Sequence, residues 1–182
     1  QATSTIANVI QLLLEKGVDP NKPDAYSIYP MQYAIEEKLI GLLQAFLQSG
    51  KVDLNVKINT PEIQNGTYLH LAALCSTNEI LDQLLSTHFF DINGVDDFGE
   101  TPLMKTAVSS NQATGALLAA QKGIDLEHLN NNQESLDDIY FRYGPKESEA
   151  AVSWVATIRC NSQQPQQKNH YPWMLKNKHQ NY

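Results

Sequence analysis

Residues 99–107 read Gly-Glu-Thr-Pro-Leu-Met-Lys-Thr-Ala, and this stretch decides the fold. Thr101 can cap a helix that begins at Pro102, because a proline in the first helical turn needs no backbone hydrogen bond. Gly99 can take the left-handed conformation that turns the chain into that helix. The small residues that follow let neighbouring helices approach closely. The stretch therefore predicts a tight turn followed by a short, closely packed helix.

The same pattern recurs elsewhere in the chain at a spacing near 34 residues. Each copy has a turn residue, a residue that begins a helix, and then small or apolar residues. One such unit cannot bury its apolar face alone, so at least three must stack to be stable. The other copies are residues 27–35, 65–73 and 132–140, and the proline position is occupied by Pro30, Tyr68, Pro102 and Ser135.

A second series of markers follows the first. Each repeat closes with an apolar helix and an Asp-x-Asn-like segment, whose last residues are Asn21, Asn55, Asn93 and Glu127. These markers are separated by 34, 38 and 34 residues, so the middle interval contains a small insertion. We place the insertion at residues 60–64, because Pro61 interrupts regular structure and an exposed hairpin tip tolerates added length.

The pattern resembles the ankyrin signature, in which a glycine and a Thr-Pro-Leu-His stretch precede small residues. The resemblance implies an all-α fold, an ankyrin-repeat solenoid of helix-turn-helix units with short hairpin loops and a C-terminal capping helix. The Asn- and Gln-rich repeats also resemble those of effectors that intracellular bacteria deliver into host cells. We expect an ankyrin-repeat domain over residues 1–160, with a partial repeat at 4–21, repeats at about 24–56, 62–94 and 96–127, a degenerate cap at 129–159, and a polar tail at 161–182.

Composition narrows the range of partners and compartments. A net charge of −7 with only two arginines lacks the basic footprint that binding to nucleic acid requires. No apolar run is long enough to span a bilayer, so no membrane partner is expected. Cys75 and Cys160 form neither a metal-ligand spacing nor a disulfide framework. These features predict an intracellular protein, cytoplasmic or nuclear, or one that acts in the host cell if it is a secreted bacterial effector.

No catalytic motif is present in the sequence, so we expect no enzyme, no cofactor and no metal. His70 and Cys75 lie on one predicted helix, but a separation of five residues places them on different faces. The family resemblance instead implies that His70 is a hydrogen-bonding brace between the turns of adjacent repeats.

The resemblance also implies where a partner binds: at the hairpin tips and the outward residues of the inner helices. Tyr26 and Phe98 are aromatic residues at expected tips, where each ring either contacts a partner or folds back onto a neighbouring repeat. Gly66, Cys75, Ser109, Asn130 and Phe141 also occupy outward positions. The expected partner-binding residues are Ala25, Tyr26, Ile28, Glu36, Glu37, Ile63, Gln64, Leu74, Asp97, Phe98, Glu100, Val108, Asn131, Gln133 and Arg142.

The leading function is therefore a protein–protein interaction module that binds a protein or peptide through its concave face. The acids Glu36, Glu37, Asp96, Asp97 and Glu100 favour a basic peptide. One alternative is a substrate-recruiting or regulatory domain of a larger enzyme, such as a protein methyltransferase, whose catalytic part lies outside this chain. Another is an array that stabilises or oligomerises its parent protein. In each case, a tail that docks through Trp173 would cover the open end of the stack.

Overall fold

The computed structural model describes residues 2–143 and residue 156. In residues 2–143 the regular structure is helical, apart from one isolated antiparallel bridge between Ile58 and Gly66. The predicted all-α solenoid is confirmed. The described helices are α1 (Ala2–Glu15), α2 (Pro30–Glu36), α3 (Ile40–Ser49), α4 (Tyr68–Cys75), α5 (Asn78–Ser86), α6 (Pro102–Val108), α7 (Gln112–Ala119) and α8 (Leu136–Tyr143).

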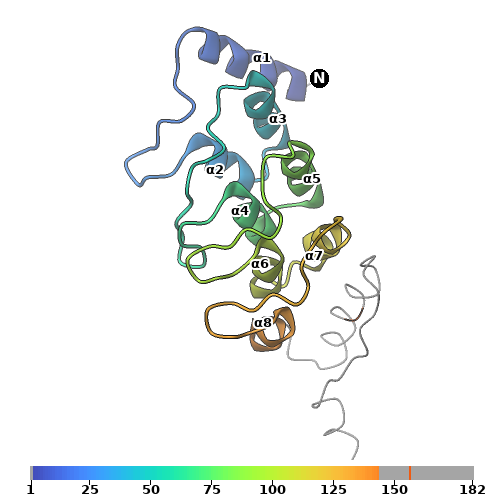
Figure 1. The fold of residues 1–182 in the computed structure, drawn as a ribbon. Helices are drawn as coiled ribbons and strands as arrows, with labels where there is room; N and C mark the ends of the chain where they lie inside the picture. The colour runs from blue at the N-terminus through green and yellow to red at the C-terminus, as the bar shows by residue number, and fades with distance from the viewer. Residues whose placement is uncertain (1, 144–155, 157–182) are drawn as a thin grey trace, which may run out of the picture.

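The helices form two columns (Figure 1). Inner helices α2, α4, α6 and α8 follow one another in one column, and each contacts the next. Outer helices α1, α3, α5 and α7 form the second column, and long hairpins extend from the inner side of the stack. The paired arrangement brings the hairpins of successive repeats side by side.

Each inner helix begins three residues after a residue in the left-handed conformation. These residues are Ser27, Asn65, Gly99 and Gln133, with φ of 63°, 56°, 73° and 62°. Thr67 Oγ1 accepts a hydrogen bond from Leu69 N at 3.2 Å, and Thr101 Oγ1 accepts one from Met104 N at 3.3 Å. The predicted turn and cap are therefore confirmed.

The assignment of Ser135 to the proline position is wrong by one residue. α8 begins at Leu136, three residues after the left-handed Gln133, as α6 begins three residues after Gly99. Ser135 instead occupies the capping position, where its Oγ accepts a hydrogen bond from Asp138 N at 3.3 Å. Asn132 is the more usual type of turn residue, but Gln133 is the residue that adopts the left-handed conformation.

Two marker asparagines join adjacent repeats in the same way. Asn21 Oδ1 accepts a hydrogen bond from Asp53 N at 2.7 Å, and its Nδ2 donates to Lys51 O at 2.8 Å. At the end of the repeat at 62–94, Asn93 makes the equivalent pair with Asp125 N at 2.9 Å and Gly123 O at 2.8 Å. These side-chain amides thus form hydrogen bonds with backbone groups of the next repeat. They connect adjacent repeats in addition to the apolar packing between the helices.

The insertion lies where the marker spacing placed it. The marker residue precedes the left-handed residue by six positions from Asn21 to Ser27 and from Asn93 to Gly99, and by ten from Asn55 to Asn65. The added segment folds back, since Ile58 and Gly66 exchange backbone hydrogen bonds of 2.9 and 3.1 Å. It also contributes Ile63 to the core, where that side chain is fully buried. The exposed position expected for Ile63 is therefore wrong.

The C-terminal capping helix, which the apolar stripe of the sequence places at residues 147–158, lies outside the described residues apart from residue 156, as does the polar tail over 161–182. The docking of Trp173 against the last helix lies outside them as well. The borders of the individual repeats remain predictions, although each predicted full repeat contains one inner and one outer helix.

Candidate protein-interaction surface

The hairpin tips comprise residues 24–28, 62–66, 96–100 and 130–134. Neighbouring tips are joined by hydrogen bonds. Asp97 N donates to Gln64 O at 2.8 Å, and Asn131 N donates to Phe98 O at 3.1 Å. Asn131 Nδ2 also donates to Asp97 O at 2.8 Å. These bonds connect the second, third and fourth tips into one surface whose geometry is set before any partner arrives.

Three of the tips share one internal hydrogen-bond pattern. Asp24 Oδ1 accepts hydrogen bonds from the backbone N–H groups two and four residues later, at 2.8 and 3.0 Å. Asp96 Oδ1 does the same at 3.0 and 3.0 Å, and Asn130 Oδ1 at 2.9 and 2.9 Å. Asn130 is only 2% exposed, so it organises the turn and the outward position expected for it is wrong.

The tips are acidic. They contain six Asp and Glu residues and no Lys or Arg. Asp24, Glu62 and Asp97 are exposed, one on each of the first three tips. The surface formed by the four tips therefore presents carboxylates to solvent at successive repeats.

Asp96 and Glu100 belong instead to a buried charge cluster around Lys105. Lys105 Nζ lies 2.7 Å from Asp96 Oδ2 and 2.6 Å from Glu100 Oε2, and it donates to Glu62 O at 2.6 Å. The side chains of Lys105 and Asp96 are fully buried, and that of Glu100 is 14% exposed. Both carboxylates thus pair with Lys105 within the fold, and the acidic concave surface expected from the sequence is smaller by these two residues.

The sequence reasoning missed Lys105. It occupies an inner-helix position where the other repeats have Tyr33, Leu71 and Ile139. The available signal was a lysine at a position that is apolar or aromatic in every other repeat. This lysine is also close to two acids in sequence. Its function is structural, because it ties the third tip to the backbone of the second.

The two tip aromatics differ in their surroundings. Tyr26 is 84% exposed, whereas Phe98 is 37% exposed, and Lys105 Nζ lies 5.1 Å from the centroid of its ring. Phe98 thus packs partly back onto the fold by a cation–π contact and presents its remaining surface outward. Tyr26 is the tip aromatic that is available to a partner over most of its surface.

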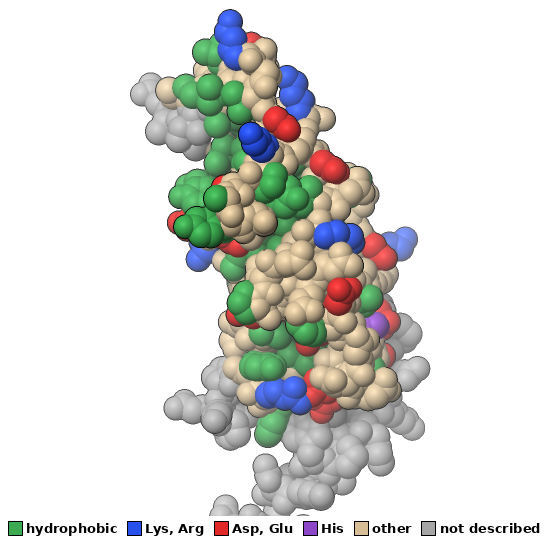
Figure 2. Space-filling view, turned by 90° about the vertical axis from the view of Figure 1, so that its left-hand side faces the viewer, with side chains coloured by type: hydrophobic (Ala, Val, Ile, Leu, Met, Phe, Trp, Pro, Cys, Tyr) green, Lys and Arg blue, Asp and Glu red, His purple; other side chains and the backbone are tan. Residues whose placement is uncertain are grey.

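The remaining predicted contact residues fall into two groups. Ile28, Glu36, Leu74 and Val108 are half-buried. Gln32 Nε2 donates to the Glu36 carboxylate at 2.9 Å, and Arg142 pairs with Glu134. The residues that are exposed are Ala25, Glu37, Gln64, Asn131, Gln133 and Arg142. Figure 2 views the molecule from the hairpin side, where hydrophobic side chains gather along one edge and uncharged polar groups cover much of the rest.

His70 is the brace that the family resemblance implied. Its Nδ1 accepts a hydrogen bond from Thr67 N at 3.1 Å, so the proton of the neutral ring lies on Nε2, which donates to Glu100 O at 3.1 Å. Burial lowers the pKa of His70 to about 4, although the nearby charge of Asp96 opposes the shift. Burial also raises the pKa of Cys75 to about 11, with the charge of Glu36 adding to the effect. The Cys75 thiol and the His70 imidazole are therefore both neutral, and each lies in its own structural environment.

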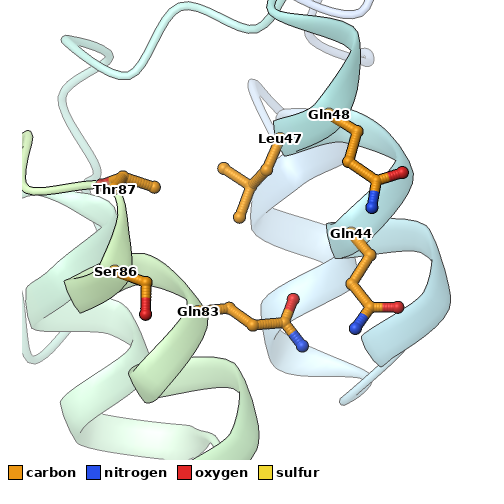
Figure 3. Close-up of a pocket in the computed structure, with 6 residues that line it drawn as sticks. All are labelled: Gln44, Leu47, Gln48, Gln83, Ser86 and Thr87. Atoms are coloured by element: carbon orange, nitrogen blue, oxygen red, sulfur yellow. The ribbon is translucent and has the colours of Figure 1, made fainter.

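A shallow groove lies between the outer helices α3 and α5 (Figure 3). It has a volume of about 370 Å³ and is lined by uncharged side chains. Two of its hydroxyls already donate inward, Ser86 to Asp82 O and Thr87 to Leu84 O. The lining residues are Gln44, Leu47, Gln48, Gln83, Ser86 and Thr87.

The described residues contain neither a metal-binding cluster nor a helix that could span a membrane. No group of three or more His, Cys, Asp or Glu side chains there is placed to hold a metal ion. In the same part of the chain, every helix is too short or too polar to cross a bilayer.

Comparison with known proteins identifies the class of fold. The family model described as "Ankyrin repeats (3 copies)" matches residues 31–130, and this chain belongs to the ankyrin-repeat family. The chain is also similar to the neurogenic locus notch homolog protein 1 of Xenopus tropicalis and of Xenopus laevis. Each is 28% identical over 130 residues, which is 71% of this chain. The chain spans only 5% of the length of these curated relatives. The family match consists of ankyrin repeats alone, which form a non-catalytic module that in general mediates protein–protein interactions.

Proposed function

We propose that the chain binds a basic, extended segment of a partner protein across its hairpin tips. The observation that carries this proposal is the row of exposed carboxylates Asp24, Glu62 and Asp97 on tips that contain no basic residue. The exposed Glu37, at the end of α2, adds a fourth acid close to the inner helices. Complementary charge raises the association rate and selects against acidic partners.

The tips also offer apolar contact area. Tyr26 combines a largely exposed ring with a polar hydroxyl, and Phe98 presents part of its ring beside Asp97. Aromatic anchors surrounded by polar groups are typical of interface hot spots. The favoured partner is therefore a segment with lysine or arginine residues and interspersed aromatic or aliphatic side chains.

The kind of protein that contains these repeats, and the compartment in which it acts, are proposals as well. A larger protein that uses the repeats to recruit a substrate, including an enzyme such as a protein methyltransferase, would place them next to another domain. The free thiol of Cys75 supports a reducing, intracellular compartment. A bacterial effector that acts in a host cell is compatible with that chemistry, and only the Asn- and Gln-rich composition supports it.

The test uses a synthetic twelve-residue peptide with four lysines, two tyrosines and no acid, titrated into the full chain by calorimetry. The triple variant Glu37→Lys, Glu62→Lys and Asp97→Lys should weaken binding at least tenfold, because it reverses the charge facing the peptide. None of these three side chains accepts a backbone N–H in the described residues, so the backbone hydrogen bonds of the hairpins remain. The side-chain hydrogen bonds that are lost run from Asn65 Nδ2 to Asp97 Oδ1 and from Thr60 Oγ1 to Glu62 Oε2, each at 3.2 Å. The affinity of the unaltered chain should also fall as ionic strength rises.

The matched control changes the same number of charges on the outer helices, with Glu15→Lys, Glu79→Lys and Asp82→Lys, whose side chains are exposed. This control should bind the peptide nearly as well as the unaltered chain does. Equal weakening by both triple variants would mean that net charge alone attracts the peptide, and the tip surface would then lose its assigned function.

A further inference from the structure

The charges of this chain are divided unevenly along the sequence. Residues 2–143 contain eighteen Asp and Glu and eight Lys and Arg, so the repeat stack is strongly acidic. Residues 161–182 contain three lysines and no acid, with Tyr171 and Trp173 between them. This terminal segment has the same composition as the partner proposed above, namely lysines interspersed with aromatic side chains.

We propose that the terminal segment 168–178 of this chain binds the acidic hairpin tips and thereby competes with an external partner. Lys168, Lys176 and Lys178 would face the carboxylates of Glu37, Glu62 and Asp97. Trp173 and Tyr171 would add aromatic contact beside Tyr26 and Phe98. This inference rests on the proposed function in one respect only, which is that both use the same surface.

The connection to the stack is long enough for this contact. The described repeats end at α8, whose inner neighbours α6, α4 and α2 follow at about 10 Å per step, so the first repeat is about 30 Å away. Twenty-five residues lead from Tyr143 to Lys168. Even with the expected helix over residues 147–158, the other thirteen could span about 45 Å when extended.

Because the terminal segment is tethered to the stack, a weak contact is sufficient for it to occupy the tips. A segment joined to its own binding surface experiences an effective concentration of about 1 mM. If the free segment bound with a dissociation constant near 100 μM, the tethered one would occupy the tips in about nine of ten molecules. External binding at the same tips would then be weakened about tenfold.

The first measurement compares backbone amide NMR spectra of the full chain with those of the full-length variant Lys168→Gln, Lys176→Gln and Lys178→Gln. Amide signals of Glu37, Asp97 and Phe98 should shift when the lysines are neutralised, and the difference should vanish in 0.5 M NaCl. The matched variant Lys16→Gln, Lys22→Gln and Lys122→Gln should leave those signals in place. A synthetic peptide of residues 161–182, added to the tail variant, should restore the original positions.

Unchanged tip signals in the tail variant would overturn the inference. Shifts confined to Phe141 and Tyr143 of α8 would also overturn it, because the tail would then cover the end of the stack and leave the tips open.

The second measurement separates this inference from the proposed function. The lysine- and tyrosine-containing twelve-residue peptide should bind the tail variant about tenfold more tightly than it binds the unaltered chain. Equal affinities would reject competition by the tail while leaving the tip surface as a binding site. If the peptide bound neither protein and the tip shifts were still present, the external function would fail and the internal contact would stand.

Discussion

At the scale of single residues, the turn residue before each inner helix has the most demanding position. Four residues there have positive φ, and at Gly99 the backbone also lies close to a neighbouring tip. A Cβ at Gly99 would lie 2.4 Å from Asn131 Oδ1 and 2.8 Å from Asn131 N. Gly99 thus allows the third and fourth tips to approach and form the hydrogen bonds between them.

Gly99→Ala should therefore destabilise the fold by about 3 kcal/mol, from left-handed strain and from the clash with Asn131. Gly17→Ala is the matched control, because Gly17 has φ of 90° and nothing within 4 Å of the added methyl group. The control should lose only about 1 kcal/mol. Urea unfolding measures both losses, and equal values would show that the contact with Asn131 is unimportant.

His70 links stability to pH. Its folded pKa of about 4 lies below the ordinary value of 6.5, so the unfolded chain binds a proton first as pH falls. The neutral ring therefore contributes its full stabilisation above pH 6.5, and this contribution decreases between pH 6.5 and 4. The loss approaches about 3 kcal/mol.

The free energy of unfolding should be measured between pH 4 and 7.5 for the unaltered chain and for His70→Gln. The difference between the two proteins should shrink as pH falls, since only the unaltered chain loses the contribution of the neutral imidazole. The control is His88→Gln, which replaces an exposed histidine. A difference that stays constant over this range would contradict the assignment.

At the scale of the helix-turn-helix element, the sequence predicted what depends on local chemistry. Thr101, Pro102 and Gly99 specify the cap, the first turn and the reversal by their own conformational preferences, and all three have those functions. The predictions that failed have two causes. Ile63 lies in an insertion whose direction of folding no local preference determines. Ser135 lies one residue before the proline position because Gln133, a residue other than glycine, makes the left-handed turn.

The predictions for the candidate surface also divide into those that depend on local sequence and those that depend on tertiary contacts. Periodicity located the hairpin tips, but it did not distinguish Asp97, which is exposed, from Asp96, which is fully buried against Lys105. Adjacent residues in a tight turn point in different directions, and only the position of Lys105 in the folded chain decides which carboxylate it neutralises.

Lys105→Met should destabilise the chain by about 3–5 kcal/mol, because it leaves two carboxylates near a buried site without their cation. The triple variant Lys105→Met, Asp96→Asn and Glu100→Gln should recover most of this loss. Asparagine can still accept the two backbone hydrogen bonds of the turn, as Asn130 does in the last repeat. Chemical denaturation gives the comparison, and a triple variant no more stable than Lys105→Met alone would refute the charge argument.

At the scale of the whole molecule, regular stacking turns local features into one surface. Asn21 and Asn93 join the repeats near their outer helices, and the bonds of Asp97 and Asn131 join the tips. An extended partner meets one hairpin tip at each step along the stack, so several weak contacts add up along a single chain. The groove between α3 and α5 lies on the outer helices and has none of the charge that the tips present.

The most direct test of the tip surface is an NMR footprint of the lysine- and tyrosine-containing peptide on the full chain. The account predicts that amide signals within residues 24–28, 62–66 and 96–100 shift together as the peptide is added, while those of Gln44, Gln83 and Thr87 stay in place. Shifts concentrated in the groove between α3 and α5, with the tips unaffected, would contradict it.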